Sequence, residues 1–235
     1  MGAISGITSP SNGSAEFNGT SDYIETGLTD AEFPSSAFTF SAWANTDTNT
    51  DFKTILGADT GISSSYGSFY FQISNIGYWR LNLTNSAGSQ FIAQDSVQAQ
   101  TNKWYYVTGV FDGSSVKIYK DGSLIASTAF TGTLAPLNTN TLIGAGYFQN
   151  NIVDFWDGNL ANVAIWNRAL TSDEINSVMW KQYEEISTSE RNGLQAWYSL
   201  DSVDSFDWYT YAQNQGAVIE GRTCVDNALN ALAQL

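Results

Sequence analysis

The sequence contains no histidine and only one cysteine, Cys224. Without histidine, neither a Ser-His-Asp triad nor a Cys-His pair can be assembled. Zinc and copper sites that use histidine are excluded as well, and one thiol cannot complete an all-cysteine site. A single cysteine also excludes a framework of intramolecular disulfides. Most nucleophilic hydrolases and the common transition-metal centres are therefore excluded.

Positive charge and long apolar runs are also scarce. Charged residues form 14% of the chain, and 9 basic residues stand against 23 acidic ones for a net charge of −14. The sequence has no basic stripe, which argues against nucleic acid and anionic membranes as partners. No stretch reaches the ~18 apolar residues of a membrane span, and residues 1–13 lack the pattern of a secretory signal. We therefore expect no membrane insertion and no signal peptide.

Aromatic residues are plentiful, with 8 Trp, 12 Tyr and 13 Phe, and they recur in strand-like patterns. Residues 37–44 alternate apolar and polar positions, and residues 68–83 read as two strands around a turn. Residues 103–111 read as a buried strand, and Asp121-Gly122 suits a two-residue hairpin turn. Such closely spaced strands predict an all-β fold, a two-sheet antiparallel jelly-roll sandwich.

One helix interrupts this pattern near the end of the strand series. Thr171 followed by Glu174 forms the sequence signature of a capping box. Ile175, Val178 and Met179 then follow at helical spacing. We expect one short helix here, lying along a sheet edge.

Three segments carry a family resemblance, and they occur in the order that the family has. Residues 103–127 contain a Trp-led strand, an Asp-Gly turn and a Tyr-x-Asp-Gly hairpin, and residues 142–146 and 157–175 complete the set. The chain thereby resembles the laminin-G-like, concanavalin A-like jelly-roll domains over a core of residues 14–180. The resemblance implies the fold but no single function, because this fold carries lectins, adhesive modules, glycanases and structural proteins.

The family's units usually open on a strand of the form Gly-Leu-x-Ala-Tyr/Trp-x-Leu/Phe-Asp, which this chain carries late, at residues 193–201. The resemblance therefore implies one jelly roll over residues 1–212, with its opening strand supplied from the C-terminus, and a strand or tail at 213–235. That strand can fill the slot in its own sheet, fill the slot of a neighbouring copy, or be a loosely attached remnant of a repeat. An empty slot would leave an unpaired sheet edge, which argues against the third arrangement.

Many family members bind calcium through oxygen ligands, and the resemblance implies candidate ligands at Asn18, Gly19, Asn162 and Asp201. The family often has aspartate at the position of Asn162, and losing that charge lowers the affinity for calcium. The alternative is that these residues form turns and caps without a metal. A second acidic segment, residues 47–52, lacks the glycine of an EF-hand loop, so a polar hairpin loop is expected there.

Two segments combine aromatic residues with Asn, Gln and Asp, namely residues 146–158 and 206–211. In exposed loops, aromatic rings stack on sugar rings while carboxamides and carboxylates bind hydroxyl groups. The candidate ligand-binding residues are Tyr147, Phe148, Asn151, Asp154, Trp156, Trp208, Tyr209 and Tyr211. Packing against a partner protein is the alternative, because aromatic residues are enriched at interfaces.

The carboxylate spacing that glycanases of this fold use, Glu-x-Asp-x-x-Glu, does not occur in the sequence, so we expect no enzyme activity. The leading interpretation is a structural or adhesive module displayed on a virion surface, such as a phage decoration or fibre protein, or in another extracellular setting. Its expected partners are a protein assembly or further copies of itself. The alternative is a calcium-dependent lectin that binds carbohydrate.

Overall fold

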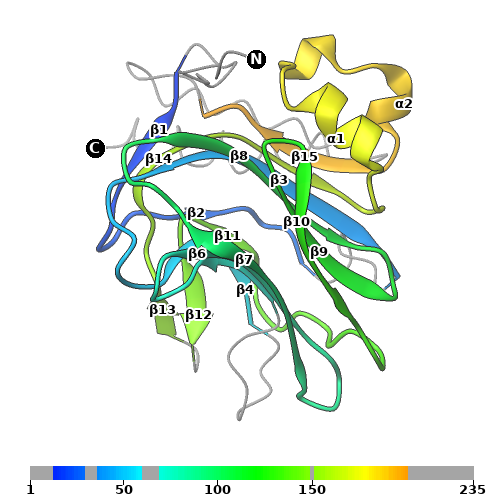
Figure 1. Ribbon diagram of the computed structural model, residues 1–235, viewed down its shortest axis with the longest axis horizontal. Helices are drawn as coiled ribbons and strands as arrows, with labels where there is room; N and C mark the ends of the chain where they lie inside the picture. The colour runs from blue at the N-terminus through cyan, green and yellow to red at the C-terminus, as the bar shows by residue number, and fades with distance from the viewer. Residues whose placement is uncertain (1–12, 30–35, 60–68, 149–150, 201–235) are drawn as a thin grey trace, which may run out of the picture.

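Two antiparallel β-sheets pack face to face in the protein, a computed structural model of which describes residues 13–29, 36–59, 69–148 and 151–200 (Figure 1). The seven-stranded sheet runs in the order β1 (Ala15–Asn18), β14 (Asp157–Trp166), β3 (Phe38–Thr46), β8 (Trp104–Phe111), β9 (Ser115–Lys120) and β10 (Ser123–Ala129), with β15 (Leu194–Tyr198) also paired to β14. The six-stranded sheet runs in the order β2 (Ile24–Glu25), β11 (Leu142–Ile143), β4 (Lys53–Ala58), β5 (Phe69–Ile73), β6 (Tyr78–Thr84) and β7 (Gln90–Gln98). A small hairpin of β12 (Gly146–Phe148) and β13 (Asn151–Val153) lies beside β4. The predicted all-β, two-sheet sandwich is confirmed.

The core between the sheets is built from alternate strand positions. Phe40 of β3 stacks on Phe69 of β5 with ring centroids 4.8 Å apart. Trp79 of β6 stacks on Trp156 at 6.1 Å, and both indoles are fully buried. Because successive side chains of a strand point to opposite faces, the intervening positions of each strand point away from this core.

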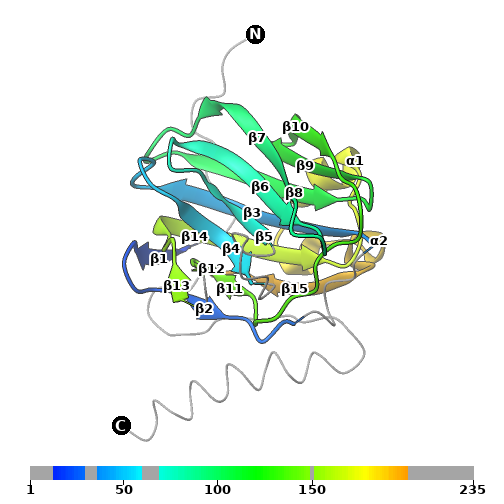
Figure 2. The same cartoon turned by 90° about the horizontal axis from the view of Figure 1, so that it is seen from below.

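The strand β14 has two partners on one of its edges, and they come from opposite ends of the described chain. β1 pairs with its first half, where Ala15 lies opposite Leu160, and β15 pairs with its second half, where Tyr198 lies opposite Val163. Figure 2 shows β1 and β15 following one another along β14. The strand predicted at residues 193–201 therefore completes the sheet of its own chain, which is the first of the three arrangements.

The chain travels from β14 to β15 through residues 171–191, which we call the helical cap. The cap contains α1 (Ser172–Val178), a short 3-10 helix η1 (Tyr183–Glu185) and α2 (Thr188–Arg191). The predicted capping box of Thr171 and Glu174 is present at the start of α1. The sequence pattern missed η1 and α2, which are only one turn long. None of the helices in the described ranges has the length and apolar character needed to cross a membrane.

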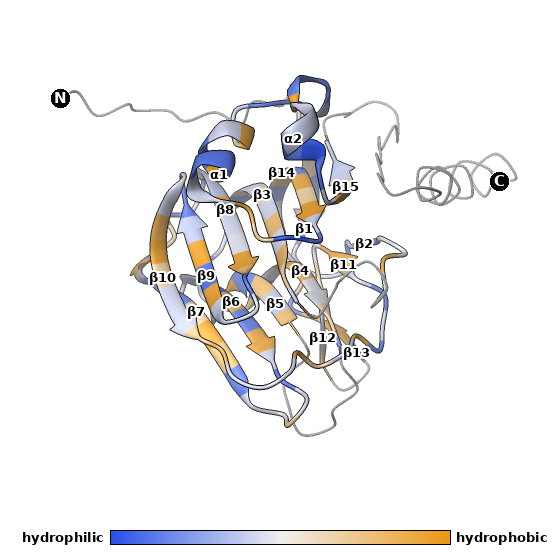
Figure 3. Cartoon of the chain, turned by 90° about the vertical axis from the view of Figure 1, so that its right-hand side faces the viewer, coloured by the Kyte–Doolittle hydropathy of each residue, from blue (hydrophilic) through white to orange (hydrophobic). Residues whose placement is uncertain are grey.

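The helical cap covers the outer face of the seven-stranded sheet, as Figures 1 and 3 show. Ile175 and Val178 of α1 pack into a second apolar cluster with Trp43, Trp166 and Trp197 of the sheet. The predicted position of the helix along a sheet edge is therefore wrong, because its apolar stripe meets tryptophans that point out of the sheet face.

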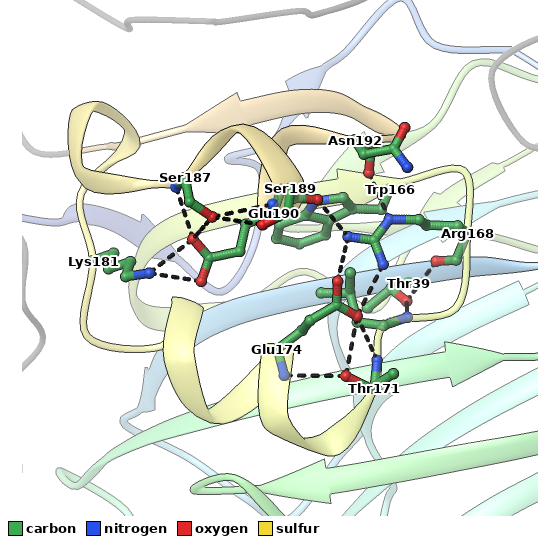
Figure 4. Close-up of polar contacts among 11 residues, drawn as sticks. Thr39, Trp166, Arg168, Thr171, Glu174, Lys181, Ser187, Ser189, Glu190 and Asn192 are labelled. Atoms are coloured by element: carbon green, nitrogen blue, oxygen red, sulfur yellow. Dashed lines mark hydrogen bonds and ion pairs between the residues drawn. The ribbon is translucent and has the colours of Figure 1, made fainter.

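Two ion pairs fasten the helical cap (Figure 4). Arg168 pairs with Glu174 at 2.7 Å, and its Nε donates to the carbonyl oxygen of Asn192 at 2.6 Å. Lys181 pairs with Glu190 at 2.6 Å, and the side chain of Glu190 is only 6% exposed. These contacts tie both ends of the cap to each other and hold the start of β15 against β14.

The second ion pair predicts an acid-dependent loss of stability. Burial alone would raise the pKa of Glu190, but hydrogen bonds from Lys181 and Ser187 outweigh it and lower the pKa to about 2. The pKa of a glutamate in the unfolded chain is ~4.3. The stabilisation of the fold by the Glu190 carboxylate is therefore complete above that pH and is lost as the pH falls towards 2. We expect Glu190→Gln to lower the free energy of unfolding at pH 7 by about 2 kcal/mol, and to have little effect near pH 2.

Urea unfolding followed by tryptophan fluorescence at both pH values measures this difference. Glu184→Gln, at an exposed carboxylate of the same cap, is the matched control and should change stability by less than about 0.5 kcal/mol. An equal effect of Glu190→Gln at both pH values would contradict the role assigned to the ion pair.

Candidate functional site

Trp156, one of the aromatic residues predicted to bind a ligand, lies in the core. It is fully buried against Trp79, and its backbone N–H donates to the carbonyl oxygen of Gly144 at 2.8 Å. An indole with no exposed surface cannot stack on a sugar, so the prediction that Trp156 contacts a ligand is wrong. The segment composition identified an aromatic residue but not the direction in which its side chain points.

The neighbouring candidates lie around the hairpin of β12 and β13. Tyr147 and Phe148 are half-buried on β12, and Asn151 is exposed on β13. The hydroxyl of Tyr70, on β5, donates to the carbonyl oxygen of Tyr147, which ties the hairpin to the six-stranded sheet. Burial raises the pKa of Tyr147, and nearby Glu25 adds to this effect. The hairpin therefore forms a border of that sheet's outer face.

The remaining candidate ligand residues, Trp208, Tyr209 and Tyr211, lie outside the described residues. The same holds for Asp201, one of the four candidate calcium ligands. Their roles stay predictions.

Two of the calcium candidates, Asn18 and Gly19, build a tight turn after β1. The side-chain oxygen of Asn18 accepts hydrogen bonds from the backbone N–H groups of Thr20, Ser21 and Asp22 at 2.9 to 3.2 Å. Gly19 donates its N–H to the carbonyl oxygen of Trp156 at 2.8 Å. The hydrogen bonds of this turn thus use the side-chain oxygen of Asn18 that would bind a metal ion.

Asn162, the third candidate, lies in a bulge in the middle of β14. Its φ is 46°, its side chain is buried, and no described residue hydrogen-bonds to its carboxamide oxygen or nitrogen. Asn18 pairs with Asp157, five residues along β14, which separates it from Asn162 by roughly 16 Å at strand spacing. Within the described ranges no three acidic, His or Cys side chains gather around a point, and calcium needs about six to eight oxygens. These residues therefore do not make a calcium site by themselves.

The structure instead shows a polar surface that the sequence analysis missed. The inward positions of β5, β6 and β7 belong to the core, as Phe71, Leu81 and Ala93 do, and the alternation along these strands appears in Figure 3. The polar residues at the outward positions of the same strands form what we call the polar face. Its partly or fully exposed residues are Tyr78, Arg80, Gln90, Gln94, Ser96 and Gln98, whereas Tyr70, Gln72, Asn82 and Thr84 are buried at its β5 side. Among them only Arg80 is charged.

Arg80 lies half-buried near the middle of the polar face. Its guanidinium lies over the ring of Phe52, 4.8 Å from the centroid. With the carboxamide of Gln72 oriented to satisfy its neighbours, its oxygen accepts from Nη2 of Arg80 at 2.6 Å and from Nε at 2.9 Å, and its nitrogen donates to Thr54. No carboxylate of the described residues forms an ion pair with Arg80. Burial lowers the pKa of Arg80, while Asp154 acts in the opposite direction.

Asp154 follows β13 at the border of the polar face. Its backbone is in the left-handed region, with φ of 56°, and its carbonyl oxygen accepts from the N–H of Thr54 at 2.9 Å. Burial raises the pKa of Asp154 to about 6, and Asp51 adds to the increase, while Arg80 and Lys53 oppose it. The carboxyl group therefore keeps its proton to a higher pH than an ordinary aspartate does.

A shallow groove of about 750 Å³ opens at the Tyr78 end of the polar face. It is lined by Asn49, Tyr78, Ser96, Val97, Gln98, Ala99, Gln100 and Thr101, none of which is charged. Asn49 donates to the carbonyl oxygen of Ala99 at 2.7 Å, and Gln98 donates to that of Ile76 at 2.8 Å, so two carboxamides are held in place by the backbone. The groove thus offers an aromatic ring beside oriented amide and hydroxyl groups.

The signal for these residues was present in the sequence. Tyr78, Arg80 and Asn82 are the alternate positions of the segment "YWRLNL", which the sequence analysis used only as evidence for a strand. The polar half of that alternation defines a surface, but a strand pattern alone does not say which side faces a partner.

Comparison with known proteins places this geometry in context. The family model described as the concanavalin A-like lectin/glucanases superfamily matches residues 18–176. No curated protein matches the chain. A solved structure of a candidate carbohydrate-binding protein from Bacteroides ovatus has a TM-score of 0.61 and 21% identity, over 83% of this chain and 53% of that one. The chain therefore spans about half the length of that protein.

Two further solved structures are similar over most of their own length. The heptameric SAP-like pentraxin of Limulus polyphemus has a TM-score of 0.55 and 16% identity, over 84% of this chain and 90% of that one. The CBM40 module of the Ruminococcus gnavus IT-sialidase, bound to α2,3-sialyllactose, has a TM-score of 0.58 and 17% identity, over 72% of this chain and 98% of that one. At these identities the similarity shows the fold alone.

The surroundings of Asp154 predict a pH-dependent change in stability. A folded-state pKa of about 6 lies above the unfolded value of ~3.9, so the stability present at low pH decreases as the pH rises through 6. We expect Asp154→Asn to be more stable than the unaltered chain at pH 7.5, by about 1 kcal/mol after allowance for solvent screening, and not at pH 4. Asparagine also tolerates the left-handed backbone at this position.

Melting temperatures at the two pH values measure the effect, and Glu16→Gln, at an exposed carboxylate of β1, is the control. A lower melting temperature of Asp154→Asn than of the unaltered chain at pH 7.5 would show that the carboxylate has a stabilising partner instead.

Proposed function

This chain belongs to the concanavalin A-like lectin/glucanases superfamily, and we propose that it is a non-catalytic module that binds glycans on its polar face. The observation that carries the proposal is the groove at Tyr78, an uncharged groove with one aromatic ring and several amide and hydroxyl groups. Sites for small ligands commonly combine an apolar or aromatic surface with a few oriented polar groups.

The chemistry of the groove suits a sugar. The ring of Tyr78 offers a flat apolar surface to the C–H face of a pyranose. The polar residues that line the groove beside Tyr78 can hydrogen-bond to the hydroxyl groups of that sugar. Gln98 and Asn49 each use their amide nitrogen for a backbone carbonyl, and their side-chain oxygens are the groups that would accept from sugar hydroxyls. The bound sialyllactose of the Ruminococcus gnavus module supports glycan binding as a use of this fold.

The absence of catalysis is part of the proposal. Glycoside hydrolysis in most families needs two carboxyl groups that flank the scissile bond, about 5 to 10 Å apart. The groove is lined by no carboxylate, and Asp154, whose carbonyl oxygen accepts from Thr54 of β4, is not among its lining residues. A sugar in the groove would therefore meet groups that bind it but none that cleave it.

The other interpretations stay predictions. A structural role on a virion surface, an extracellular location and assembly with further copies do not require the polar face, and none of its features supports them. Dependence on calcium rests on Asp201, which lies outside the described residues. Loss of glycan binding after chelation would favour a calcium-dependent lectin.

Substitution of the groove's aromatic ring tests glycan binding. On a glycan array and in calorimetry with the best array ligand, we expect Tyr78→Ala to weaken binding about tenfold or more, because the stacking surface is lost. Trp180→Ala, at a half-exposed aromatic residue after α1, is the control and should bind as the unaltered chain does. Failure of the unaltered chain to bind any glycan, or release of sugar from a bound one, would contradict the proposed function.

A further inference from the structure

We propose that Arg80 receives the carboxylate of an acidic sugar, so that the ligand of the polar face is an oligosaccharide with one carboxylated unit beside neutral ones. This inference rests on the proposed function and specifies its ligand. It follows from the arrangement of Arg80, Gln72, Phe52 and the uncharged groove at Tyr78.

Arg80 has an unused binding edge. Gln72 occupies the Nε side of the guanidinium, through bonds to Nε at 2.9 Å and Nη2 at 2.6 Å. The opposite edge, formed by Nη1 and the second hydrogen of Nη2, has no hydrogen-bond partner among the described residues. That edge has the geometry that accepts both oxygens of a carboxylate at once.

The surroundings of Arg80 favour a paired over an unpaired guanidinium. The ring of Phe52 covers one face of its plane at 4.8 Å and limits access of water there. A half-buried cation without a paired anion bears a desolvation cost, which a carboxylate in the ligand would offset. The hydrogen bonds with Gln72 also fix the orientation of the guanidinium group before the ligand binds.

The groove supplies the place for the neutral part of the ligand. Tyr78 and Arg80 are two residues apart on β6 and point to the same side, so their Cα atoms are about 7 Å apart. This spacing is of the order of one sugar unit with its linkage. A sugar stacked on Tyr78 can thus carry an adjacent acidic sugar to Arg80 along the direction of the strand.

The same surface excludes ligands with many negative charges. The carboxylate of Asp154 acts on Arg80, Asp51 acts on Asp154, and Asp59 acts on neighbouring Tyr70. The whole chain carries a net charge of −14. A single carboxylate can use the open edge of Arg80, whereas a sulfated polysaccharide would meet repulsion over the rest of the polar face.

Matched glycans test the inference by calorimetry. 3′-Sialyllactose is compared with lactose, and a trisaccharide of one glucuronate on xylobiose is compared with xylotriose, so that the two arms distinguish sialic from uronic acids. We expect at least one acidic glycan to bind at least tenfold more tightly than its neutral counterpart. We expect a heparin oligosaccharide to bind more weakly than that acidic glycan. Equal affinity within both pairs would overturn the inference and leave the proposed function standing, whereas no binding of any glycan would overturn both.

Variants locate the preference at Arg80. We expect Arg80→Gln to reduce the ratio of the affinities for the acidic and the neutral glycan to near one. We expect Arg80→Lys to retain part of this ratio, because lysine keeps the positive charge but cannot bind both carboxylate oxygens as a guanidinium does. Lys117→Gln, on β9 of the other sheet, removes the same charge and should keep the full ratio. An unchanged ratio in a folded Arg80→Gln, or an equal loss in Lys117→Gln, would show that the preference arises from net charge and not from this residue.

Discussion

The pairing of β14 on both of its edges is the constraint on which the rest of the structure depends. β14 has ten residues, and β3 accompanies it along one edge. On the other edge β1 supplies four residues and β15 five, and the bulge at Asn162 lies where the two partners meet. Without β15 the second half of β14 would expose unpaired backbone groups, and the core would lose Tyr198 and Ala196. A strand placed late in the sequence is thus an integral part of the sandwich.

The route to β15 determines what each sheet can do. The chain leaves β14, crosses the outer face of the seven-stranded sheet as the helical cap, and returns antiparallel along the same edge. Trp43, Trp166 and Trp197 are buried by this crossing, and two ion pairs hold it. One outer face of the sandwich is therefore used to complete the fold. The outer face of the six-stranded sheet has no helical cover among the described elements, and its accessible polar residues around Tyr78, Arg80 and Gln98 form the surface to which we assign ligand binding.

Prediction from the sequence succeeded where a residue pattern has one structural meaning. Alternation, Asp-Gly turns and a capping box identified the strands, the hairpin at Asp121 and the helix at Thr171. The site could not be predicted in the same way. Trp156 and Tyr147 lie within ten residues of each other in one aromatic segment, but only the folded sheet decides that the first points inward. Arg80 was hidden in a strand pattern, because its role depends on Gln72 of β5 and on Phe52, which lies just before β4.

Hydrogen exchange of the full chain, with and without 3′-sialyllactose, tests most directly the claim that one sheet closes the fold and the other binds the ligand. The account predicts slower exchange on addition of the glycan in residues 70–82 and 94–101, with exchange in residues 171–198 unchanged. Slower exchange confined to residues 171–198 would place the ligand on the helical cap and contradict this division between the two sheets.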